Sequence, residues 1–377
     1  MVLENCTYPL DARVRMEAQT LLDAGLSVEV LAPREPGRPA RETVDGVRVR
    51  RFVCPDGGGS LAGTAIEYAV ALAMVSVAIL ARLLRWRRRT LHVHNPPDCF
   101  FPLLWLARAC GWSTVFDNHD DAAGMMRAKL GPGTRLAAPL AWMRDRSARA
   151  ADLTIATNET QRELLAPAAR KTIVVRNSPP VWFADHSPTP PSAHPRLVFL
   201  GEIGAQDRVE LAVDILRALV EDRGIDAELL VVGDGPRRGA VEERADRLGV
   251  TERVTLTGWV PFERVPVLLA SAHVGLDTAP PTEVNDGSTM VKILEYLAVG
   301  LPVVATALHE TRVTAGDALV AVERDSAEAF VEPLAELLSS TEAWRESATK
   351  AKARGGELLW PLQGERLTAA YRGLPGR

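Results

Sequence analysis

Short apolar segments alternate with helical segments along nearly the whole chain, and this alternation constrains the fold more than any other feature. In the first half, strands are expected at 2–4, 27–31, 47–53, 91–94, 113–116, 153–156 and 172–175, and helices at 12–23, 61–86, 101–109, 134–150 and 159–165. Strands that alternate with helices in this way favour parallel sheets with helices on both faces. The sequence therefore predicts an α/β fold.

A proline-rich break divides this pattern into two series. Residues 185–195, DHSPTPPSAHP, contain four prolines and few large apolar side chains, which is typical of a linker. The alternation then restarts, with strands expected at 197–200, 228–232, 254–256 and 302–305, and helices at 208–220, 237–248, 264–270, 327–338, 342–354 and 359–371. Because 377 residues exceed one ordinary core, we expect an N-terminal domain at 1–184, a linker at 185–195, a C-terminal domain at 196–358 and a last helical segment at 359–377.

Composition excludes several classes of function. The formal net charge of −4 and the pI near 6.0 give no electrostatic case for binding nucleic acid. The four cysteines form no Cys-x-x-Cys pair, which argues against a zinc or redox site, and no metal site is expected. The N-terminus lacks the pattern of a signal peptide, so a cytoplasmic location is expected.

One apolar run leaves two interpretations open. Residues 68–81 carry no charge, and they are followed by Trp86 and by arginines at positions 82, 85, 87, 88 and 89. The run is shorter than the roughly 20 apolar residues that span a bilayer. It is either a helix buried against the first sheet or an interfacial helix with Trp86 and the arginines at headgroup level. A peripheral contact with the inner face of the membrane therefore remains open.

The segment 285–306, NDGSTMVKILEYLAVGLPVVAT, predicts an anion site. A loop enters a helix there, Ser288 or Thr289 can cap it, and the unpaired N–H groups and dipole of its first turn suit an anion. Lys292 adds a positive charge on the same face. Glu295 lies three residues further on, and a carboxylate there can accept two hydrogen bonds from a vicinal diol. Such a helix can hold a diphosphate and the attached ribose.

These residues resemble the nucleotide-sugar-binding signature of the retaining, family 4 type glycosyltransferases with the GT-B fold. The resemblance implies two facing Rossmann-like domains with a cleft between them, and a terminal helix that returns to the N-terminal domain. It also implies a nucleotide-diphosphate sugar as donor, a hydroxyl acceptor on a glycan, a glycolipid or a natural product, and neither a cofactor nor a bound metal. The N-terminal domain would bind the acceptor and the C-terminal domain the donor.

The chain departs from the family pattern at the diphosphate. Many members place an Arg and a Lys where this chain has Glu202 and Asp207, and a carboxylate repels a diphosphate. Lys292 is then expected to be the replacement cation, with Arg208 as a second.

A second departure concerns the donor sugar. The first Glu of the family's paired motif is replaced by Gly287, so Asp286 or Asn285 is expected to take its role. The resemblance also places Gly201 and Trp259 at the donor, Trp259 in a segment that frames the base.

His119 follows an expected strand in the sequence FDNHD, which resembles the family element whose His contacts the donor sugar. At the carboxyl end of a strand, a His can donate a hydrogen bond to a sugar hydroxyl or a developing oxyanion, and His119 is the expected catalytic residue. The alternative is a structural histidine bonded to Asp117 or Asp121.

Two further segments are expected on the acceptor side. His92 and His94 also end a strand, where they would either line the acceptor side with Asn95 and Asp98 or pack in the core beside Pro96 and Pro97. With no carboxylate near them beyond Asp98, the two histidines make a poor metal site. The loop containing Asp11, Arg13 and Arg15 resembles an acceptor-side loop, although Asp11 could simply cap a helix, and the arginines could form surface pairs or meet an acidic acceptor.

Two kinds of alternative are weighed against the transferase: another enzyme with the same fold, and a subunit without catalytic activity. A sugar-nucleotide epimerase or a phosphorylase would need an acid/base set or an extra cofactor pocket, and neither is visible in the sequence. A catalytically idle subunit that binds a nucleotide sugar and supports a partner enzyme is favoured by the family residues that this chain lacks. Turnover by the purified chain alone separates the idle subunit from the transferase.

Overall fold

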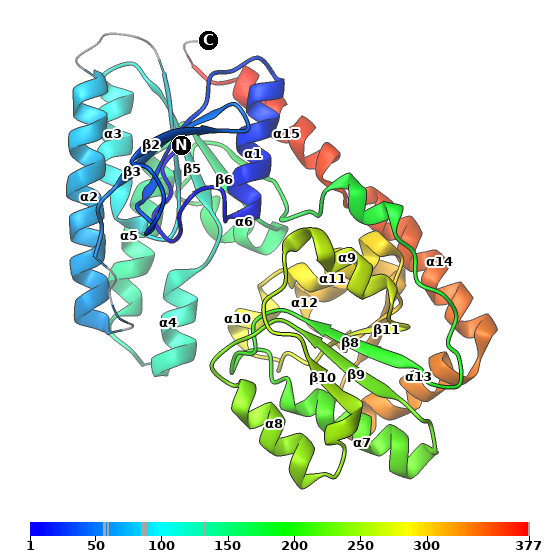
Figure 1. The fold of residues 1–377 in the computed structure, drawn as a ribbon. Helices are drawn as coiled ribbons and strands as arrows, with labels where there is room; N and C mark the ends of the chain where they lie inside the picture. The colour runs from blue at the N-terminus through cyan, green and yellow to red at the C-terminus, as the bar shows by residue number, and fades with distance from the viewer. Residues whose placement is uncertain (56–57, 59, 84–88, 132, 376–377) are drawn as a thin grey trace. The chain divides into compact units, whose positions relative to one another are not determined.

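The computed structural model describes residues 1–55, 58, 60–83, 89–131 and 133–375, and the chain forms two compact units (Figure 1). The first unit consists of Met1–Arg176 and Gln363–Arg377, and the second of Asn177–Leu362. Each unit has its own, mainly parallel sheet with helices on it, so the predicted α/β architecture with two sheets is confirmed.

Among the residues that the structure describes, the sheet of the first unit contains seven strands: β1 (Glu29–Pro33), β2 (Arg41–Val44), β3 (Val47–Phe52), β4 (Thr90–His94), β5 (Ser113–Asn118), β6 (Leu153–Ala156) and β7 (Thr172–Val174). Neighbours follow the orders β1-β3-β2 and β4-β5-β6-β7, and β2 alone is antiparallel to its neighbour among the described strands. Val2 pairs with both Leu31 of β1 and Val93 of β4. The expected first strand at 2–4 is therefore a single bridge that joins the two groups.

The first unit's helices are α1 (Ala12–Asp23), α2 (Leu61–Leu83), α3 (Phe101–Ala109), α4 (Ala122–Leu130), α5 (Ala137–Ala150) and α6 (Glu159–Leu165), with the short 3-10 helix η1 (Asp98–Phe100). The expected helices at 12–23, 101–109 and 159–165 are confirmed to the residue. α2 is described as far as Leu83. Residues 84–88, which include the expected end of this helix at Trp86 and three of the arginines that follow the apolar run, lie outside the described part of the chain. Apolar residues of α2, α3 and α5 pack on one face of the sheet around Val93 and Phe116.

The sheet of the second unit has six strands in the order β10-β9-β8-β11-β12-β13, and all its pairs are parallel. Their bounds are β8 (Arg196–Leu200), β9 (Glu228–Val232), β10 (Val254–Leu256), β11 (Val274–Asp277), β12 (Val303–Thr306) and β13 (Leu319–Val322). Leu197 and Phe199 of β8 belong to one buried cluster, and Val198 and Leu200 to the other. Because side chains alternate along a strand, both faces of this sheet are apolar, as a parallel sheet covered by helices requires.

The helices of the second unit pack on these two faces. They are α7 (Glu210–Arg223), α8 (Arg238–Arg247), α9 (Val265–Ala270), α10 (Glu283–Asp286), α11 (Val291–Val299), α12 (His309–Ala315), α13 (Ala327–Ser339) and α14 (Thr341–Glu357), with 3-10 helices η2 (Val181–Asp185), η3 (Thr251–Arg253), η4 (Phe262–Arg264) and η5 (Gly316–Ala318). Residues of α7, α8 and α13 line one core cluster, and residues of α9, α11 and α14 line the other.

The last helix, α15 (Trp360–Arg372), brings the C-terminal end of the chain into the same unit as the N-terminal residues. From Gln363 onward it belongs to the first unit. There the Gln363 side chain accepts a hydrogen bond from the backbone N–H of Arg176 at 3.0 Å, and the Tyr371 hydroxyl lies 2.6 Å from Nδ1 of His92. The C-terminal helix is therefore tied to buried polar groups of the N-terminal unit.

Candidate functional site

The segment 285–306 forms the end of α10, a loop and then α11, and the capping of α11 differs from the prediction. The helix begins at Val291 with Met290 as its N-cap. The expectation that Ser288 or Thr289 caps α11 is wrong, because both lie in the preceding loop. Ser288 instead donates its hydroxyl hydrogen bond to the carbonyl of Val284 at 2.6 Å.

The N-terminus of α11 keeps the character of an anion site. The side chain of its N-cap residue, Met290, makes no capping hydrogen bond. Ile293 N–H donates to the Met290 carbonyl at 3.0 Å, which uses one first-turn donor within the helix itself. The helix dipole places partial positive charge at this end, so an anion would be stabilised there.

Lys292, in the first turn of α11, is buried between two carboxylates. Its Nζ donates to Oδ1 of Asp207 at 2.6 Å and to Oδ1 of Asp277 at 3.3 Å. The Lys292 side chain is 7% exposed, and Nζ lies 4.4 Å from the centroid of the Phe199 ring. An ammonium group has three N–H donors, so these two bonds leave one for a ligand.

The charges around Lys292 fix its protonation. Burial alone would lower the pKa of Lys292, but Asp277 and Asp207 together raise it above its usual value. Lys292 therefore carries a full positive charge, as expected of a replacement cation. The structure adds that this charge is shared between Asp207 and Asp277.

Glu295 lies one turn further along α11 and is 9% exposed. Burial raises its pKa to about 8, although Lys292 opposes the shift. Without a ligand, the side chain is therefore mostly a neutral carboxylic acid at pH 7. The expected diol contact from a carboxylate requires that proton to leave when a ribose binds.

Glycines bring two loops into backbone contact beside Lys292. Gly201 and Gly233 follow β8 and β9 with φ of +137° each, a region that favours glycine. A Cβ on Gly233 would lie 1.9 Å from the carbonyl oxygen of Gly201, and a Cβ on Gly235 would lie 2.7 Å from the backbone of Ile203. A Cβ on Gly201 would be 3.4 Å from Cε of Lys292. The loops therefore frame Lys292 at the carboxyl edge of the sheet, where parallel α/β sheets bind ligands.

The other expected donor residues are spread around this edge. Asp286 accepts a hydrogen bond from the backbone N–H of His309 at 2.8 Å, and Gly287 ends α10. Arg208 has a positive φ of 52° and forms an ion pair with Asp325, so it is not a free second cation in the described chain. Trp259 is 72% exposed after β10.

His119 lies in the first unit, directly after β5. Its Nε2 is 3.1 Å from Nδ1 of His94 and 3.3 Å from Oδ2 of Asp117, and its side chain is 10% exposed. Its backbone N–H donates to the side-chain oxygen of Asn95. His119 is thus a partly accessible member of a buried polar cluster.

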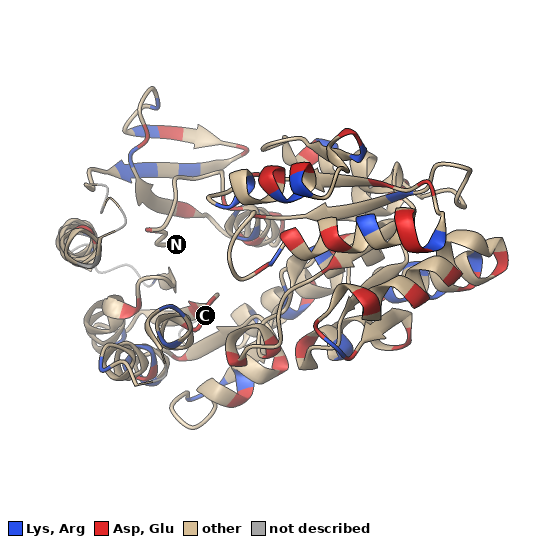
Figure 2. Ribbon diagram, turned by 90° about the horizontal axis from the view of Figure 1, so that it is seen from below, with Lys and Arg blue, Asp and Glu red and all other residues tan. Residues whose placement is uncertain are grey.

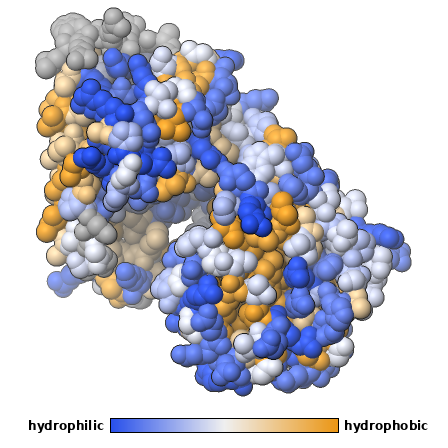
Figure 3. Space-filling view, in the orientation of Figure 1, coloured by the Kyte–Doolittle hydropathy of each residue, from blue (hydrophilic) through white to orange (hydrophobic). Residues whose placement is uncertain are grey.

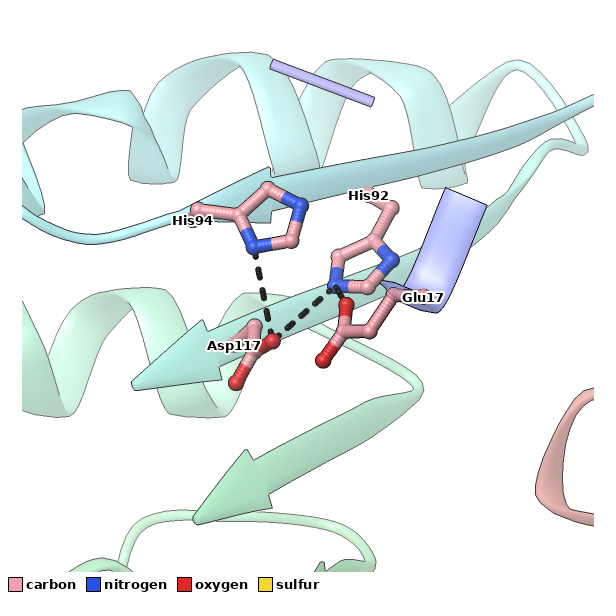
Figure 4. Close-up of side chains that lie close together, drawn as sticks. All are labelled: Glu17, His92, His94 and Asp117. Atoms are coloured by element: carbon pink, nitrogen blue, oxygen red, sulfur yellow. Dashed lines mark ion pairs between the residues drawn. The ribbon is translucent and has the colours of Figure 1, made fainter. Parts of the chain in front are cut away.

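Arg13, Glu17, His92, His94 and Asp117 form the buried part of this cluster, and Figure 4 shows four of them. Arg13 donates to Oδ1 and Oδ2 of Asp117 at 2.9 and 3.2 Å, and its Nε lies 3.1 Å from Oε1 of Glu17. It also donates to the carbonyl of Val175 at 2.8 Å. The expectation of a surface or acceptor contact for Arg13 is wrong, because the helix turns this side chain into the core, where it is 5% exposed.

The protonation states of the cluster follow from its burial. Burial would raise the pKa of Asp117, but Arg13 and His119 hold it well below its usual value. Burial and the neighbouring Asp117 raise the pKa of Glu17 well above its usual value, despite Arg13. The cluster therefore contains one ionised carboxylate paired with Arg13, and a second carboxyl group whose protonated form is favoured by burial.

Two of the histidines are neutral as well. Burial lowers the pKa of His92 to about 4, although Asp117 opposes the shift. Burial and the neighbouring His92 lower the pKa of His94 well below its usual value. Nε2 of His92 lies 3.6 Å from Oδ2 of Asp117, which favours the tautomer with the proton on Nε2. In that tautomer Nδ1 is free of a proton and accepts the hydrogen bond that the Tyr371 hydroxyl donates.

The surroundings of His92 and His94 differ from the expectation. Two carboxylates, Asp117 and Glu17, stand beside them, whereas Asp98 accepts a hydrogen bond from Asn95 at 3.1 Å. The expectation that no carboxylate beyond Asp98 is close was therefore wrong. Glu17, His92, His94 and Asp117 offer ligand atoms within 4.8 Å of one another. Arg13 already places a positive charge beside Asp117 and Glu17, which disfavours a further cation at this point.

The residues expected on the acceptor side differ in their surroundings. Asn95 is fully buried, and its amide donates to Asp98, to Asn118 and to the carbonyl of Asp120. Asp11 caps α1 by accepting from the N–H of Val14 at 2.9 Å. His94 is fully buried, and Arg15 is partly exposed on α1.

Glu17 and Tyr371 were missed in the sequence. Glu17 lies four residues after Arg13, so the two share one face of α1, and that spacing was the available signal. Tyr371 gave no such signal, because its partner is 279 residues away.

Two family profiles match the chain. The profile of the glycosyl transferases group 1 matches residues 194–340, within the second unit. The profile of the glycosyl transferase 4-like domain matches residues 10–178, almost entirely within the first unit. Together the two matches cover most of both units.

Known proteins share parts of the sequence and the whole fold. The 2-deoxystreptamine glucosyltransferase of Streptomyces kanamyceticus is 30% identical over 116 residues, which are 31% of this chain and 28% of that protein, so the match spans less than a third of the relative. Sucrose-phosphate synthase from Thermosynechococcus elongatus superposes with a TM-score of 0.75 at 17% identity, over 98% of this chain and 94% of that one. Anabaena HepE in complex with UDP superposes with a TM-score of 0.72 at 14% identity, over 99% of each chain. The chain therefore belongs to the group 1, family 4 type glycosyltransferases with the GT-B fold.

Proposed function

We propose that the protein is a retaining glycosyltransferase that moves a sugar from a nucleotide-diphosphate sugar to a hydroxyl group of an acceptor. The observation that carries the proposal is the N-terminal turn of α11, where an uncapped helix end, the charged Lys292 and the buried Glu295 occur within five residues of Val291. The solved relative HepE is described in complex with UDP, which supports a diphosphate in this kind of site.

The donor would bind along the first turns of α11. The diphosphate would lie at the uncapped N-terminus, where helix N–H groups and the dipole stabilise negative charge. The remaining N–H donor of Lys292 would add a charge-assisted hydrogen bond. Glu295, one turn on, would accept hydrogen bonds from the two ribose hydroxyls after losing its proton. Each group then recognises a different part of one nucleotide.

Charge stabilisation and positioning would do the chemical work. As the glycosidic bond breaks, negative charge grows on the leaving diphosphate, and the N-terminus of α11 with Lys292 would stabilise it. The acceptor hydroxyl would attack from the same face of the sugar, its proton would pass to the departing phosphate oxygen, and the configuration would be retained. His119 would donate a hydrogen bond to the donor sugar, held in place by Asp117. This scheme needs neither a metal ion nor a cofactor.

A transfer assay with purified protein tests the proposal. UDP-, GDP-, ADP-, dTDP- and CMP-sugars are incubated with the chain and simple alcohol or sugar acceptors, in buffer containing EDTA. Release of the nucleotide with formation of a product that keeps the donor's anomeric configuration, measured by NMR, is the expected result. His119→Ala should lower the rate by about a hundredfold or more while nucleotide affinity stays within about twofold.

Two results would contradict the proposal. A nucleotide that binds without any turnover, in water or with acceptors, would indicate a binding subunit. Inverted product configuration would refute the retaining mechanism alone. Binding is followed by thermal shift, since a ligand that binds the folded state raises the melting temperature.

A further inference from the structure

Helix α2 has a buried face and an exposed face, and both are apolar. Ala71, Val75 and Ile79 of α2 are buried in the core of the first unit. On the other side, Ile66 is 60% exposed and Val77 is 68% exposed. A helix on the surface of a water-soluble protein normally carries polar side chains on its outer face.

The exposed side chains of α2 from 62 to 81 are all apolar, and the polar residues in this range, Thr64, Glu67, Tyr68 and Ser76, are half-buried. Each exposed position in this range is Ala, Ile, Met, Val or Leu. Met74 and Leu80 are 41% and 46% exposed, and with Ile66 and Val77 they follow helical spacing along one stripe. Figure 3 shows this apolar surface along the edge of the unit formed by α2. A continuous apolar stripe of this length marks a surface for another apolar phase or partner.

Three exposed arginines lie on the sheet face that α2 covers. Arg48 and Arg50 of β3 are exposed, and they alternate with buried residues, so they lie on the same face of the sheet as Phe52, which packs in the core beneath α2. Arg41 of β2 is directly opposite Arg50, and it therefore lies on that face too. Figure 2 shows these Arg segments on the two neighbouring strands.

The three arginines are available for an external partner. Arg41, Arg48 and Arg50 form no ion pair among the side chains that the structure describes. By contrast, Arg51 on the opposite face is buried and paired with Glu42. The α2 surface, defined as the exposed stripe of α2 with Arg41, Arg48 and Arg50, is thus apolar along one edge and cationic beside it.

α2 lies on the core of the first unit. Its segment Ala62–Leu83 is long and apolar enough to cross a membrane, with a mean hydropathy of 2.0. Removing it into a bilayer, however, would uncover the buried cluster that contains Phe52 and Phe100. A helix that covers a core with one face and exposes an apolar stripe with the other is suited to lie at an interface.

We propose that the α2 surface docks the protein on a bilayer that contains anionic lipids, with the apolar stripe in the acyl–headgroup region and the three arginines at lipid phosphates. Burial of apolar side chains and attraction of arginines to anionic headgroups are the two contributions that hold peripheral proteins on membranes. This inference goes beyond the transfer reaction and does not depend on it.

The arginines distinguish a bilayer from a second copy of the chain. In a symmetric dimer the α2 surface of one subunit contacts the α2 surface of the other, so Arg41, Arg48 and Arg50 of both subunits would lie in the same interface. Like charges in a desolvated interface are repelled. An anionic bilayer offers the opposite charge, and the lipid surface is therefore the occupant that fits both halves of the patch.

Vesicle flotation of the full chain tests the docking. Vesicles of phosphatidylcholine alone are compared with vesicles of phosphatidylcholine and phosphatidylglycerol. The wild type should float with the anionic vesicles and less so at high salt. Ile66→Gln with Val77→Gln should lower partitioning at least about tenfold, and Arg41→Gln with Arg48→Gln and Arg50→Gln should lower it about a hundredfold on anionic vesicles. The arginine variant should also lose its preference for them over neutral ones.

The control replaces matched residues of the second unit. Val267 is 52% exposed and Arg345 is exposed, and Val267→Gln with Arg345→Gln should float like the wild type. Hydrogen exchange of the wild type gives a readout without variants: peptides of α2 should gain protection when anionic vesicles are added.

Three outcomes would overturn the proposal. The first is no flotation of the wild type with either vesicle. The second is an equal loss in the control and the α2 variants. The third is a concentration-dependent dimer that the Ile66 and Val77 changes abolish, without vesicle binding, which would assign the surface to a second copy. Nucleotide binding is measured in parallel, so failure of docking is distinguishable from failure of the transferase proposal.

Discussion

Lys292 Nζ lies 2.6 Å from Oδ1 of Asp207, although 85 residues separate them in the chain. Asp207 stands where relatives carry a cation, and Lys292 is the expected replacement for that cation. The structure places these two residues in direct contact through a buried ion pair. Lys292 also bonds Asp277, so its positive charge is shared between two carboxyl groups, and an anion at this site would depend on the N-terminus of α11 as well as on Lys292.

Replacement of Lys292 by Met should destabilise the second unit by about 3–5 kcal/mol, because it leaves Asp207 and Asp277 buried without a cation. The additional change Asp207→Asn should recover part of that loss. The free energy of unfolding of the two single variants and the double variant, measured in urea, gives the coupling between the residues. Values that simply add would show that the contact contributes nothing.

This instability also affects how binding is tested. A loss of nucleotide binding in a Lys292 variant could follow from partial unfolding of the site. Glu295→Gln is the safer probe, because the buried side chain is already mostly neutral and the amide has nearly the same shape.

Nucleotide binding should strengthen with pH if Glu295 must lose its proton to hold the ribose. The pKa of Glu295 is about 8 without ligand. Below that pH each binding event releases a proton, so affinity should rise about tenfold between pH 6 and 7 and level off above pH 8. Calorimetric titration across this range measures it. The Glu295→Gln variant binds the same nucleotide, whose phosphate ionises in the same way, but it lacks the titrating carboxyl group. Its affinity should therefore depend less on pH than that of the wild type, and an identical pH dependence would show that Glu295 does not contact the nucleotide.

The fold was predictable because local pattern and burial agree. Leu197–Leu200 and Glu228–Val232 are apolar runs that a doubly covered parallel sheet requires, and both strands form there. β11 was missed because Gly275 interrupts a short apolar run. A Cβ on Gly275 would lie 2.5 Å from the ring of Tyr296, so the close approach of that ring requires glycine in the strand. This packing comes from Tyr296 of α11, a separate element of the chain, and is not visible in the local sequence.

The site was predictable only where its residues are close in sequence. Lys292 and Glu295 could be placed on one helix from their spacing. The partners of Lys292 could not, because Asp207 lies in the segment after β8 and Asp277 is the last residue of β11. The same holds for Tyr371, whose contact with His92 depends on the path of the last helix.

The Arg13–Asp117 pair should matter more for stability than Glu17, although all three are buried. Arg13→Met leaves Asp117 ionised and unpaired, and it should cost about 3–5 kcal/mol. Burial and Asp117 raise the pKa of Glu17 well above its usual value and so favour its neutral form, and Glu17→Gln should therefore change stability by less than about 1 kcal/mol at pH 7. Urea unfolding at pH 7 measures both. Equal costs would show that Glu17 is ionised in the fold.

The hydrogen bond between Tyr371 and His92 should hold the last helix on the first unit. Tyr371→Phe removes the hydroxyl and should cost about 1–2 kcal/mol, since Nδ1 of His92 stays buried without its partner. Hydrogen exchange of α15 should become faster in this variant. Unchanged exchange and stability would indicate that water or another group satisfies His92.

Backbone contact between the two loops of the second unit makes Gly233 irreplaceable, and the chain provides a matched glycine for comparison. Gly233→Ala would place a Cβ 1.9 Å from the carbonyl oxygen of Gly201, at a φ of +137°. The loops would have to separate beside Lys292, so the variant should lose nucleotide binding and several kcal/mol of stability, or fail to fold. Gly239 lies in α8 with open space around its Cβ position, and Gly239→Ala should stabilise the protein by about 0.5–1 kcal/mol. Thermal melting with and without nucleotide measures both, and a Gly233→Ala protein that melts and binds like the wild type would show that these loops do not form the donor site.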